Sequence, residues 1–104
     1  MTTIESLGVI KRTISLILPD SEVILFGSRA KGEEKVNSDF DLLIISEKVT
    51  DNSHRLHYQS IIRRQLAEQN ILADIIVQSR YEIPVKRKLP GHIVKTAIEE
   101  GIIL

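Results

Sequence analysis

The sequence contains no cysteine, which excludes three kinds of chemistry. A chain without thiols forms no disulfide framework, performs no thiol catalysis and builds no zinc site on sulfur. It also has no tryptophan and only two tyrosines and two phenylalanines, so its core must be mainly aliphatic. The apolar run Leu42–Ile45 is far shorter than the ~20 residues that a membrane-spanning helix needs.

The chain also lacks an excess of charge of either sign, because 14 basic residues balance 14 acidic ones. Nucleic-acid-binding proteins usually carry a basic excess or a basic stripe, so we expect no direct nucleic-acid binding. The stretch Met1–Glu5 has neither a basic nor an apolar segment of the kind that begins a secretory signal. We therefore expect a cytoplasmic protein that forms a single domain over residues 1–104.

The spacing of apolar residues predicts an α/β (α+β) fold in the order α-β-α-β-α-β-α, with helices flanking a small mixed β-sheet. The expected elements are a helix over 4–18, a strand over 22–26, a loop or short helical piece over 27–35, a strand over 39–45, a helix over 53–69, a strand over 72–77 and a helix over 92–100. In the helix over 53–69, the residues expected to face the core are Leu56, Ile61, Ile62, Leu66 and Ala67. Residues 79–88 are expected to be irregular because of Pro84 and Pro90, and 102–104 form an apolar tail.

Two carboxylates begin the second predicted strand. Because strand side chains alternate, Asp39 and Asp41 face the same side with Cα atoms about 6.5–7 Å apart. Two carboxylates aimed at one point repel each other, and hard oxygen donors of this kind suit Mg²⁺ or Mn²⁺. Alternatively, Asp39 caps a turn while Asp41 points to solvent.

A third carboxylate, Asp74, lies within the apolar strand over 72–77. A buried and unpaired carboxylate costs several kcal/mol, so we expect a partner for it. A metal ion shared with Asp39 and Asp41 is such a partner if the two strands are neighbours. Alternatively, Asp74 lies at the end of its strand and reaches water or an arginine.

The pair Gly27-Ser28 directly follows the first predicted strand. Glycine lets the backbone approach a ligand closely, and successive N–H groups in such a turn can hold a phosphate. The Ser28 hydroxyl adds a donor, and Arg29 and Lys31 are near enough in sequence to meet phosphate charge. Most Gly-Ser pairs after a strand are only turns, and no Gly-Lys-Ser/Thr follows as in a P-loop.

Taken together, the three features resemble the nucleotidyltransferase superfamily of the DNA polymerase β type. The segments Gly27-Ser28-Arg29-Ala30-Lys31-Gly32 and Ser38-Asp39-Phe40-Asp41-Leu42-Leu43 are similar to the minimal nucleotidyltransferase (MNT) family in particular. The stretch 92–104, with Glu99-Glu100-Gly101-Ile102-Ile103-Leu104, is also similar to the end of that family's chains, so the resemblance covers most of the sequence.

The resemblance implies a function for each motif. Gly27, Ser28 and Arg29 would bind the triphosphate of an NTP, and Asp39 and Asp41 would bind two Mg²⁺ ions. Asp74 would complete one metal site and help activate the acceptor hydroxyl. Transfer of a nucleotide is an in-line displacement at phosphorus that depends mainly on positioning and on neutralisation of charge.

The resemblance also implies a partner, because minimal members are similar to the antitoxin half of MNT/HEPN toxin–antitoxin pairs. In such pairs the antitoxin transfers AMP from ATP to a helical HEPN ribonuclease. Two alternatives remain: an inactive antitoxin that acts by contact, and a nucleotidyltransferase that modifies a small molecule as a homo-oligomer. The sequence leaves open the nucleotide base, the acceptor residue and the oligomeric state.

Other features are weaker. His54 and His57 lie three residues apart on a predicted helix, and together with Arg63-Arg64 and Lys86-Arg87-Lys88 they are expected to form solvated surface. The last apolar residues exceed what one short helix needs, so part of them, with the basic stretch 79–88, is expected to contact a helical partner. These residues are Ile93, Val94, Ile98, Ile102, Ile103 and Leu104.

Overall fold

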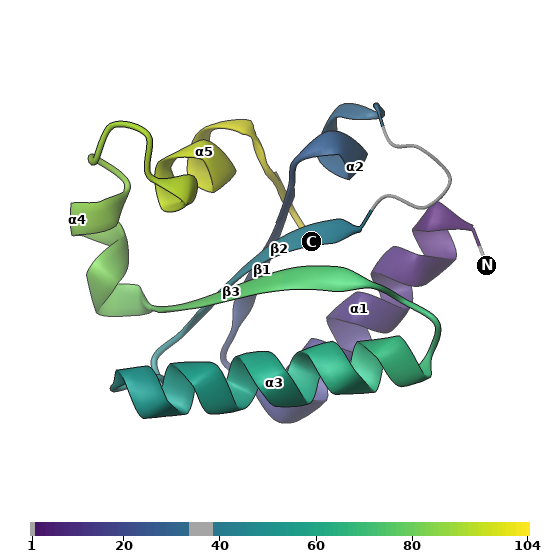
Figure 1. Ribbon diagram of the computed structural model, residues 1–104. Coiled ribbons are helices and arrows are strands. Elements are labelled where there is room, and N and C mark those ends of the chain that lie inside the picture. The colour runs from purple at the N-terminus through teal and green to yellow at the C-terminus, as the bar shows by residue number, and fades with distance from the viewer. Residues whose placement is uncertain (1, 34–38) are drawn as a thin grey trace.

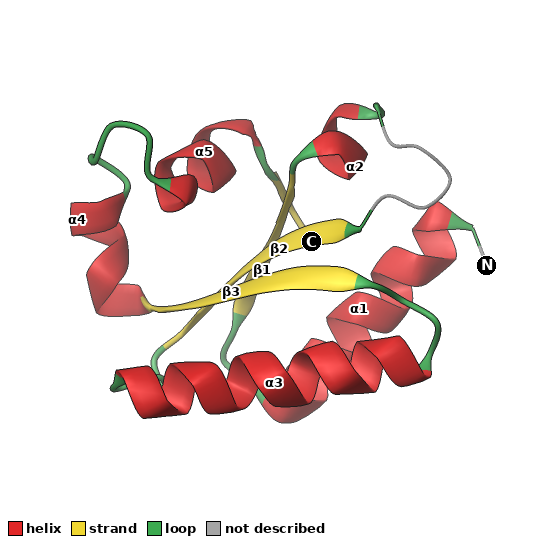
Figure 2. Cartoon of the chain, in the orientation of Figure 1, coloured by secondary structure: helices red, strands yellow, loops and turns green. Residues whose placement is uncertain are grey.

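A computed structural model describes residues 2–33 and 39–104. The end of the turn expected over 27–35, and Ser38 of the second motif, lie outside these residues. The elements in chain order are α1 (Thr3–Ile17), β1 (Glu22–Phe26), α2 (Ser28–Lys31), β2 (Phe40–Ser46), α3 (Asn52–Glu68), β3 (Ala73–Ser79), the 3₁₀ helix η1 (Arg80–Glu82), α4 (Ile83–Lys86), α5 (Ile93–Glu100) and β4 (Ile102–Ile103). Figure 2 shows the mixture of helices and strands that the sequence predicts.

The four strands form one mixed sheet in the order β3-β2-β1-β4. β1 pairs antiparallel with β2 and with β4, whereas β2 and β3 run parallel. Parallel neighbours need a crossover connection, and α3 supplies it. Figure 1 shows α1 and α3 on one face of the sheet and α2, α4 and α5 toward the other.

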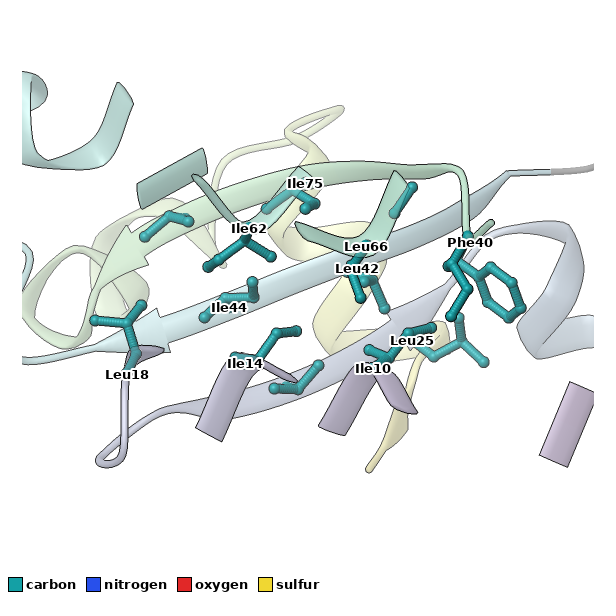
Figure 3. Close-up of a cluster of buried hydrophobic side chains, with 14 of the residues drawn as sticks. Ile10, Ile14, Leu18, Leu25, Phe40, Leu42, Ile44, Ile62, Leu66 and Ile75 are labelled. Atoms are coloured by element: carbon teal, nitrogen blue, oxygen red, sulfur yellow. The ribbon is translucent and has the colours of Figure 1, made fainter. Parts of the chain in front are cut away.

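The larger core lies between the sheet and the helices α1 and α3. It is almost wholly aliphatic, as the shortage of aromatic residues predicts, and Figure 3 shows its side chains in close contact. Fully buried members of this core include Ile10 and Ile14 from α1 and Ile62 and Leu66 from α3. Alternate residues of each strand point into it, so the intervening residues face the opposite side of the sheet.

That opposite side is only partly covered. A smaller core forms where α5 packs on the sheet, with Val94 and Ala97 against Ile24, Phe26 and Leu43. The ends of the strands nearest α2 remain open on this side of the sheet, and they include the acidic residues of the second and third motifs.

The structure corrects three expectations. Leu56 and Ala67 are exposed rather than in the core, and the buried residues of α3 are Ile62 and Leu66. The stretch 79–88 is not irregular: it forms η1 and α4, with Pro84 in the first turn, where proline is tolerated. The apolar tail forms β4, which pairs with β1 through Ile102 and Ile103.

The helix ends follow their local chemistry. Thr2 and Glu5 form a capping box at the start of α1. At the start of α3, the Asp51 carboxylate accepts a hydrogen bond from the His54 amide. Asn70 has a positive φ of 63° just after α3, as its expected role in ending that helix requires. None of the helices in residues 2–33 and 39–104 is long and apolar enough to cross a membrane.

Candidate nucleotidyl-transfer site

The three aspartates of the two motifs lie on neighbouring strands. Asp41 is the second residue of β2, and the sheet register places it opposite Asp74 of β3 on one side and Phe26 of β1 on the other. Opposite residues on paired strands share a face of the sheet, so Asp41 and Asp74 point the same way. Asp39 directly precedes β2 and, two residues before Asp41, lies on this face as well.

The carboxylates affect one another electrostatically. Partial burial raises the pKa of Asp41, and the negative charges of Asp74 and Asp39 raise it further. Each of these causes disfavours the ionised form, and a cation between the carboxylates offsets the repulsion. Among residues 2–33 and 39–104, however, no group of three or more carboxylate, imidazole or thiol side chains is placed so that it could hold a metal ion.

The structure corrects the expected burial of Asp74. The sequence places this aspartate in an apolar strand, but its side chain is exposed, as is that of Asp39. Asp74 is the second residue of β3 on the partly covered face, so water reaches it and no buried partner is required. The surroundings of Asp74 therefore match the alternative interpretation, in which an aspartate near the end of its strand reaches water.

Gly27 brings the backbone after β1 against the side chain of Asp41. It has φ +73° and ψ −156°, a conformation that residues with a side chain rarely adopt. A Cβ atom built on Gly27 would lie only 2.2 Å from the Asp41 Oδ2 atom. The glycine therefore permits a close approach that no other residue type would allow.

Ser28 begins the short helix α2 directly after this glycine. Within the described residues, no side chain caps the start of α2. The Gly27 carbonyl oxygen accepts hydrogen bonds from the Ala30 and Lys31 amides. Ser28 therefore lies at the start of this helix, directly after the glycine that approaches Asp41. A turn of this kind is able to bind phosphate oxygens.

The two cations after Ser28 have other contacts in this structure. The Arg29 guanidinium lies 4.1 Å from the centre of the Phe40 ring, and Phe40 points to the opposite face of β2 from Asp41. The Lys31 Nζ atom lies 3.6 Å from a carboxylate oxygen of Glu100 on α5. A phosphate contact by Arg29 would require its guanidinium to leave the Phe40 ring.

The histidines and the basic surface residues do not join this site. The His54 ring contacts the Thr50 hydroxyl and the Asp51 carboxylate, and the His57 ring packs edge-on against Tyr58. Arg63 and Arg64 are exposed, as are Arg87 and Lys88, whereas Lys86 bonds to Gln78 and pairs with Glu82.

The apolar residues near the end of the chain divide between core and surface. Val94 is fully buried, so it is excluded from the docking surface that the sequence suggests, and Ile98 is half-buried. Ile93, Ile102 and Ile103 are exposed.

Sequence reasoning missed two residues near the site. Phe40, between the paired aspartates, holds the Arg29 guanidinium. Leu72, expected in an apolar strand, lies just before β3 with 63% of its surface exposed beside Asp74. In the sequence, the position of Arg29 between Gly27 and Phe40 only weakly indicates the contact between Arg29 and Phe40. No local pattern in the sequence indicates that Leu72 is exposed.

Comparison with known proteins agrees with this geometry. A family model described as a nucleotidyltransferase domain matches residues 8–104. The chain is 47% identical over 47 residues to the probable protein adenylyltransferase MntA of Haemophilus influenzae. The match covers 45% of this chain and 41% of that relative, so the similarity spans less than half of either protein.

Solved structures share the fold. A minimal nucleotidyltransferase superposes with a TM-score of 0.63 at 23% identity, covering 100% of this chain and 97% of that one. A chain from the complex of tri-AMPylated Shewanella oneidensis HEPN toxin with MNT antitoxin superposes with a TM-score of 0.59 at 17% identity. That match covers 99% of this chain and 71% of the other. At these identities the likeness establishes the fold and not the activity.

Proposed function

Because the chain belongs to the nucleotidyltransferase domain family, we propose that it transfers AMP from ATP to a hydroxyl group of a protein partner. The partner is proposed to be a helical HEPN-type toxin, which the transfer neutralises. The resemblance to MntA, a probable protein adenylyltransferase, and to a complex that contains an AMPylated HEPN toxin supports both parts of this proposal.

One observation carries the proposal: Asp41 lies opposite Asp74 in the sheet and against the backbone of Gly27. The proposed phosphate-binding turn and a pair of carboxylates therefore meet at the same end of neighbouring strands, with Asp39 two residues away. Nucleotidyl transfer needs this combination, because the triphosphate and the metal ions that neutralise it must be held together.

The chemistry of the donors fits Mg²⁺, because this ion prefers hard carboxylate oxygens, although the three carboxylates are not placed to hold an ion together in this structure. Asp39 and Asp41 would hold two Mg²⁺ ions and Asp74 would complete one of the sites. When bound, the ions neutralise charge that develops on the phosphates. The raised pKa of Asp41, caused by burial and then by the neighbouring carboxylates, is consistent with a cation between them.

The residues of the chain divide the chemical step between them. Gly27 and Ser28 orient the triphosphate so that the bond to pyrophosphate lies opposite the incoming hydroxyl oxygen. That oxygen forms a bond to the α-phosphorus, the bond to pyrophosphate breaks, and pyrophosphate leaves with the electron pair. The carboxylate of Asp74 accepts the proton of the hydroxyl group, which its exposure on this face allows.

The experiment combines the chain with ATP labelled at the α-phosphate, Mg²⁺ and the HEPN-type protein encoded beside it. The expected result is a labelled partner whose mass increases by one or more AMP groups. The Asp39→Ala variant should give no labelled partner, whereas Arg64→Ala, on the exposed side of α3, should label it normally. A tight complex without label under any NTP would contradict the proposal and favour inhibition by contact.

A further inference from the structure

The strand that carries Asp74 is one of the two edge strands of the described sheet. Among the strands that the structure describes, β3 pairs with β2 only and has no neighbour on its other side. The Phe40 amide donates a hydrogen bond to the Leu72 carbonyl oxygen at 3.0 Å. This bond determines which residues of β3 direct their backbone N–H and C=O groups toward β2 and which direct them away. The backbone groups of Asp74 and Ile76 therefore bond to β2, whereas those of Ala73 and Ile75 point away from the sheet.

The far half of this edge is closed by side chains of the protein itself. The Val77 amide donates to the Gln59 side-chain oxygen of α3 at 3.0 Å. The Ser79 amide donates to the Glu82 carboxylate at 3.2 Å. Proteins commonly protect edge strands in such ways, because an open edge pairs readily with another chain.

The near half of the edge lacks this protection, although Ala73 and Ile75 themselves are only 7% and 4% exposed, so side chains around them must move aside for another chain to pair there. Within the described residues, the outward amides of Ala73 and Ile75 have no hydrogen-bond partner. These two residues flank Asp74 in the chain. The only unprotected stretch of the β3 edge in the described structure thus coincides with the position of the proposed catalytic base.

A cation flanks this unprotected half. Gln59 reaches the edge at Val77, and Arg63 follows it by one helical turn on the same side of α3. That turn advances about 6 Å toward the start of β3, which matches the advance from Val77 to Ile75 along the strand. Arg63 is exposed and makes no ion pair with any described residue.

The neighbouring arginine differs in its surroundings. Arg64 lines a shallow surface hollow together with Gln65, Glu68 and Gln69. It therefore has an acidic residue nearby and faces another side of α3. Arg64 and Arg63 form a matched pair in which only Arg63 flanks the open edge.

We propose that the acceptor enters the site as an extended segment that adds to the edge of β3 at Ala73 and Ile75, with an acidic residue facing Arg63. This inference rests on the proposed function and specifies how the acceptor is recognised. Outward N–H and C=O groups repeated every second residue are satisfied by an extended backbone, and Arg63 favours a carboxylate beside it.

The geometry also places the reacting group. A residue of the added segment that pairs with Asp74 has its side chain on the same face of the sheet, about 5 Å away. A serine, threonine or tyrosine at that position therefore directs its hydroxyl group toward the Asp74 carboxylate. The exposed Leu72 side chain beside Asp74 supplies an apolar contact for a neighbouring residue of the segment.

The first test measures backbone amide exchange by NMR in the ¹⁵N-labelled chain, alone and with the HEPN-type protein encoded beside it. In the free chain, the Ala73 and Ile75 amides should exchange faster than those of Asp74 and Val77. In the complex, exchange of both open amides should slow at least about tenfold, because each gains a backbone hydrogen bond. Unchanged exchange of both amides in a complex that transfers AMP would overturn the inference while the proposed function stands.

The second test compares the two arginines by steady-state kinetics of AMP transfer. Arg63→Glu should raise the KM for the partner protein by about fivefold or more and leave the kcat and the KM for ATP unchanged. Arg64→Glu should leave all three values near those of the wild type. Equal effects of the two variants, or an effect on kcat alone, would contradict docking beside Arg63.

The two proposals fail differently. If no AMP is transferred but the complex protects Ala73 and Ile75, the proposed function is wrong and the docking of an extended segment is supported. If AMP is transferred and neither the amides nor Arg63 respond, the docking is wrong and the function is supported.

Discussion

Replacing Gly27 with alanine tests whether the close approach to Asp41 organises the site. The added Cβ atom would lie 2.2 Å from Oδ2, 3.1 Å from Cγ and 3.3 Å from Cβ of Asp41. Rotation of the Asp41 side chain relieves the contacts with Oδ2 and Cγ, whereas the 3.3 Å contact with Cβ requires a shift of only a few tenths of an ångström. The Gly27→Ala variant must therefore move the Asp41 carboxylate from its position beside the turn between β1 and α2.

The expected loss of stability follows from two contributions. An unfavourable backbone conformation at Gly27 costs about 1–3 kcal/mol. A side chain forced from its preferred rotamer at Asp41 costs about 0.5–1.5 kcal/mol more. We expect the free energy of unfolding to fall by about 2–4 kcal/mol, and AMP transfer to fall by about a hundredfold because a reacting geometry is displaced.

Gly32→Ala is the matched control. Gly32 also has a positive φ, 71°, but a Cβ atom there would meet no described atom within 4 Å. This variant should lose about 1 kcal/mol from the backbone conformation alone and transfer AMP normally. Urea unfolding followed by circular dichroism and the labelled-ATP assay measure both effects. Equal stability losses with normal transfer in both variants would refute the reasoning.

Three further predictions concern aspartates. Burial and then the carboxylates of its neighbours raise the pKa of Asp41, so folding favours its protonated form and the free energy of unfolding falls as pH rises through that pKa. At pH 7 in EDTA, the Asp41→Asn variant should therefore have a larger free energy of unfolding than the wild type. A smaller free energy of unfolding would contradict this prediction. Asp74→Asn should keep most Mg²⁺–ATP affinity in calorimetry but lose about 10²–10⁴-fold in kcat, and a wild-type rate would exclude a role as base. Burial opposes the ionised form of Asp20, but hydrogen bonds from the Ser46 hydroxyl and the Glu47 amide, both 2.8 Å, lower its pKa. Asp20→Ala should thus lose about 1 kcal/mol near pH 7, and the loss should vanish as pH falls through the lowered pKa in a urea series.

Local patterns predicted the elements that depend on local chemistry. The apolar run from Val23 to Phe26 gave the strand β1 with its observed ends, and the spacing of Ile10 and Ile14 gave the buried side of α1. The resemblance in the two motifs predicted the candidate site residues, and the sheet register places two of them, Asp41 and Asp74, opposite each other. These features follow from periodicity and from short motifs.

Features that depend on distant contacts could not be predicted. Ile102 and Ile103 form a strand only because β1 offers a free edge beside them. Asp74 is exposed on the partly covered face of the sheet, which the apolar sequence around it does not reveal. Pro84 predicts irregular structure locally, but it lies in the first turn of α4, where its missing N–H has no helical partner to lose.

The most direct test of the proposed site is calorimetric titration of ATP into the chain alone, with Mg²⁺ and with EDTA. The wild type should bind ATP much more tightly with Mg²⁺, and Asp41→Asn should remove this difference while remaining folded. The Gly32→Ala variant should behave as the wild type does. An Asp41→Asn variant that binds Mg²⁺–ATP with wild-type affinity would contradict the assignment of the carboxylates as a metal and nucleotide site.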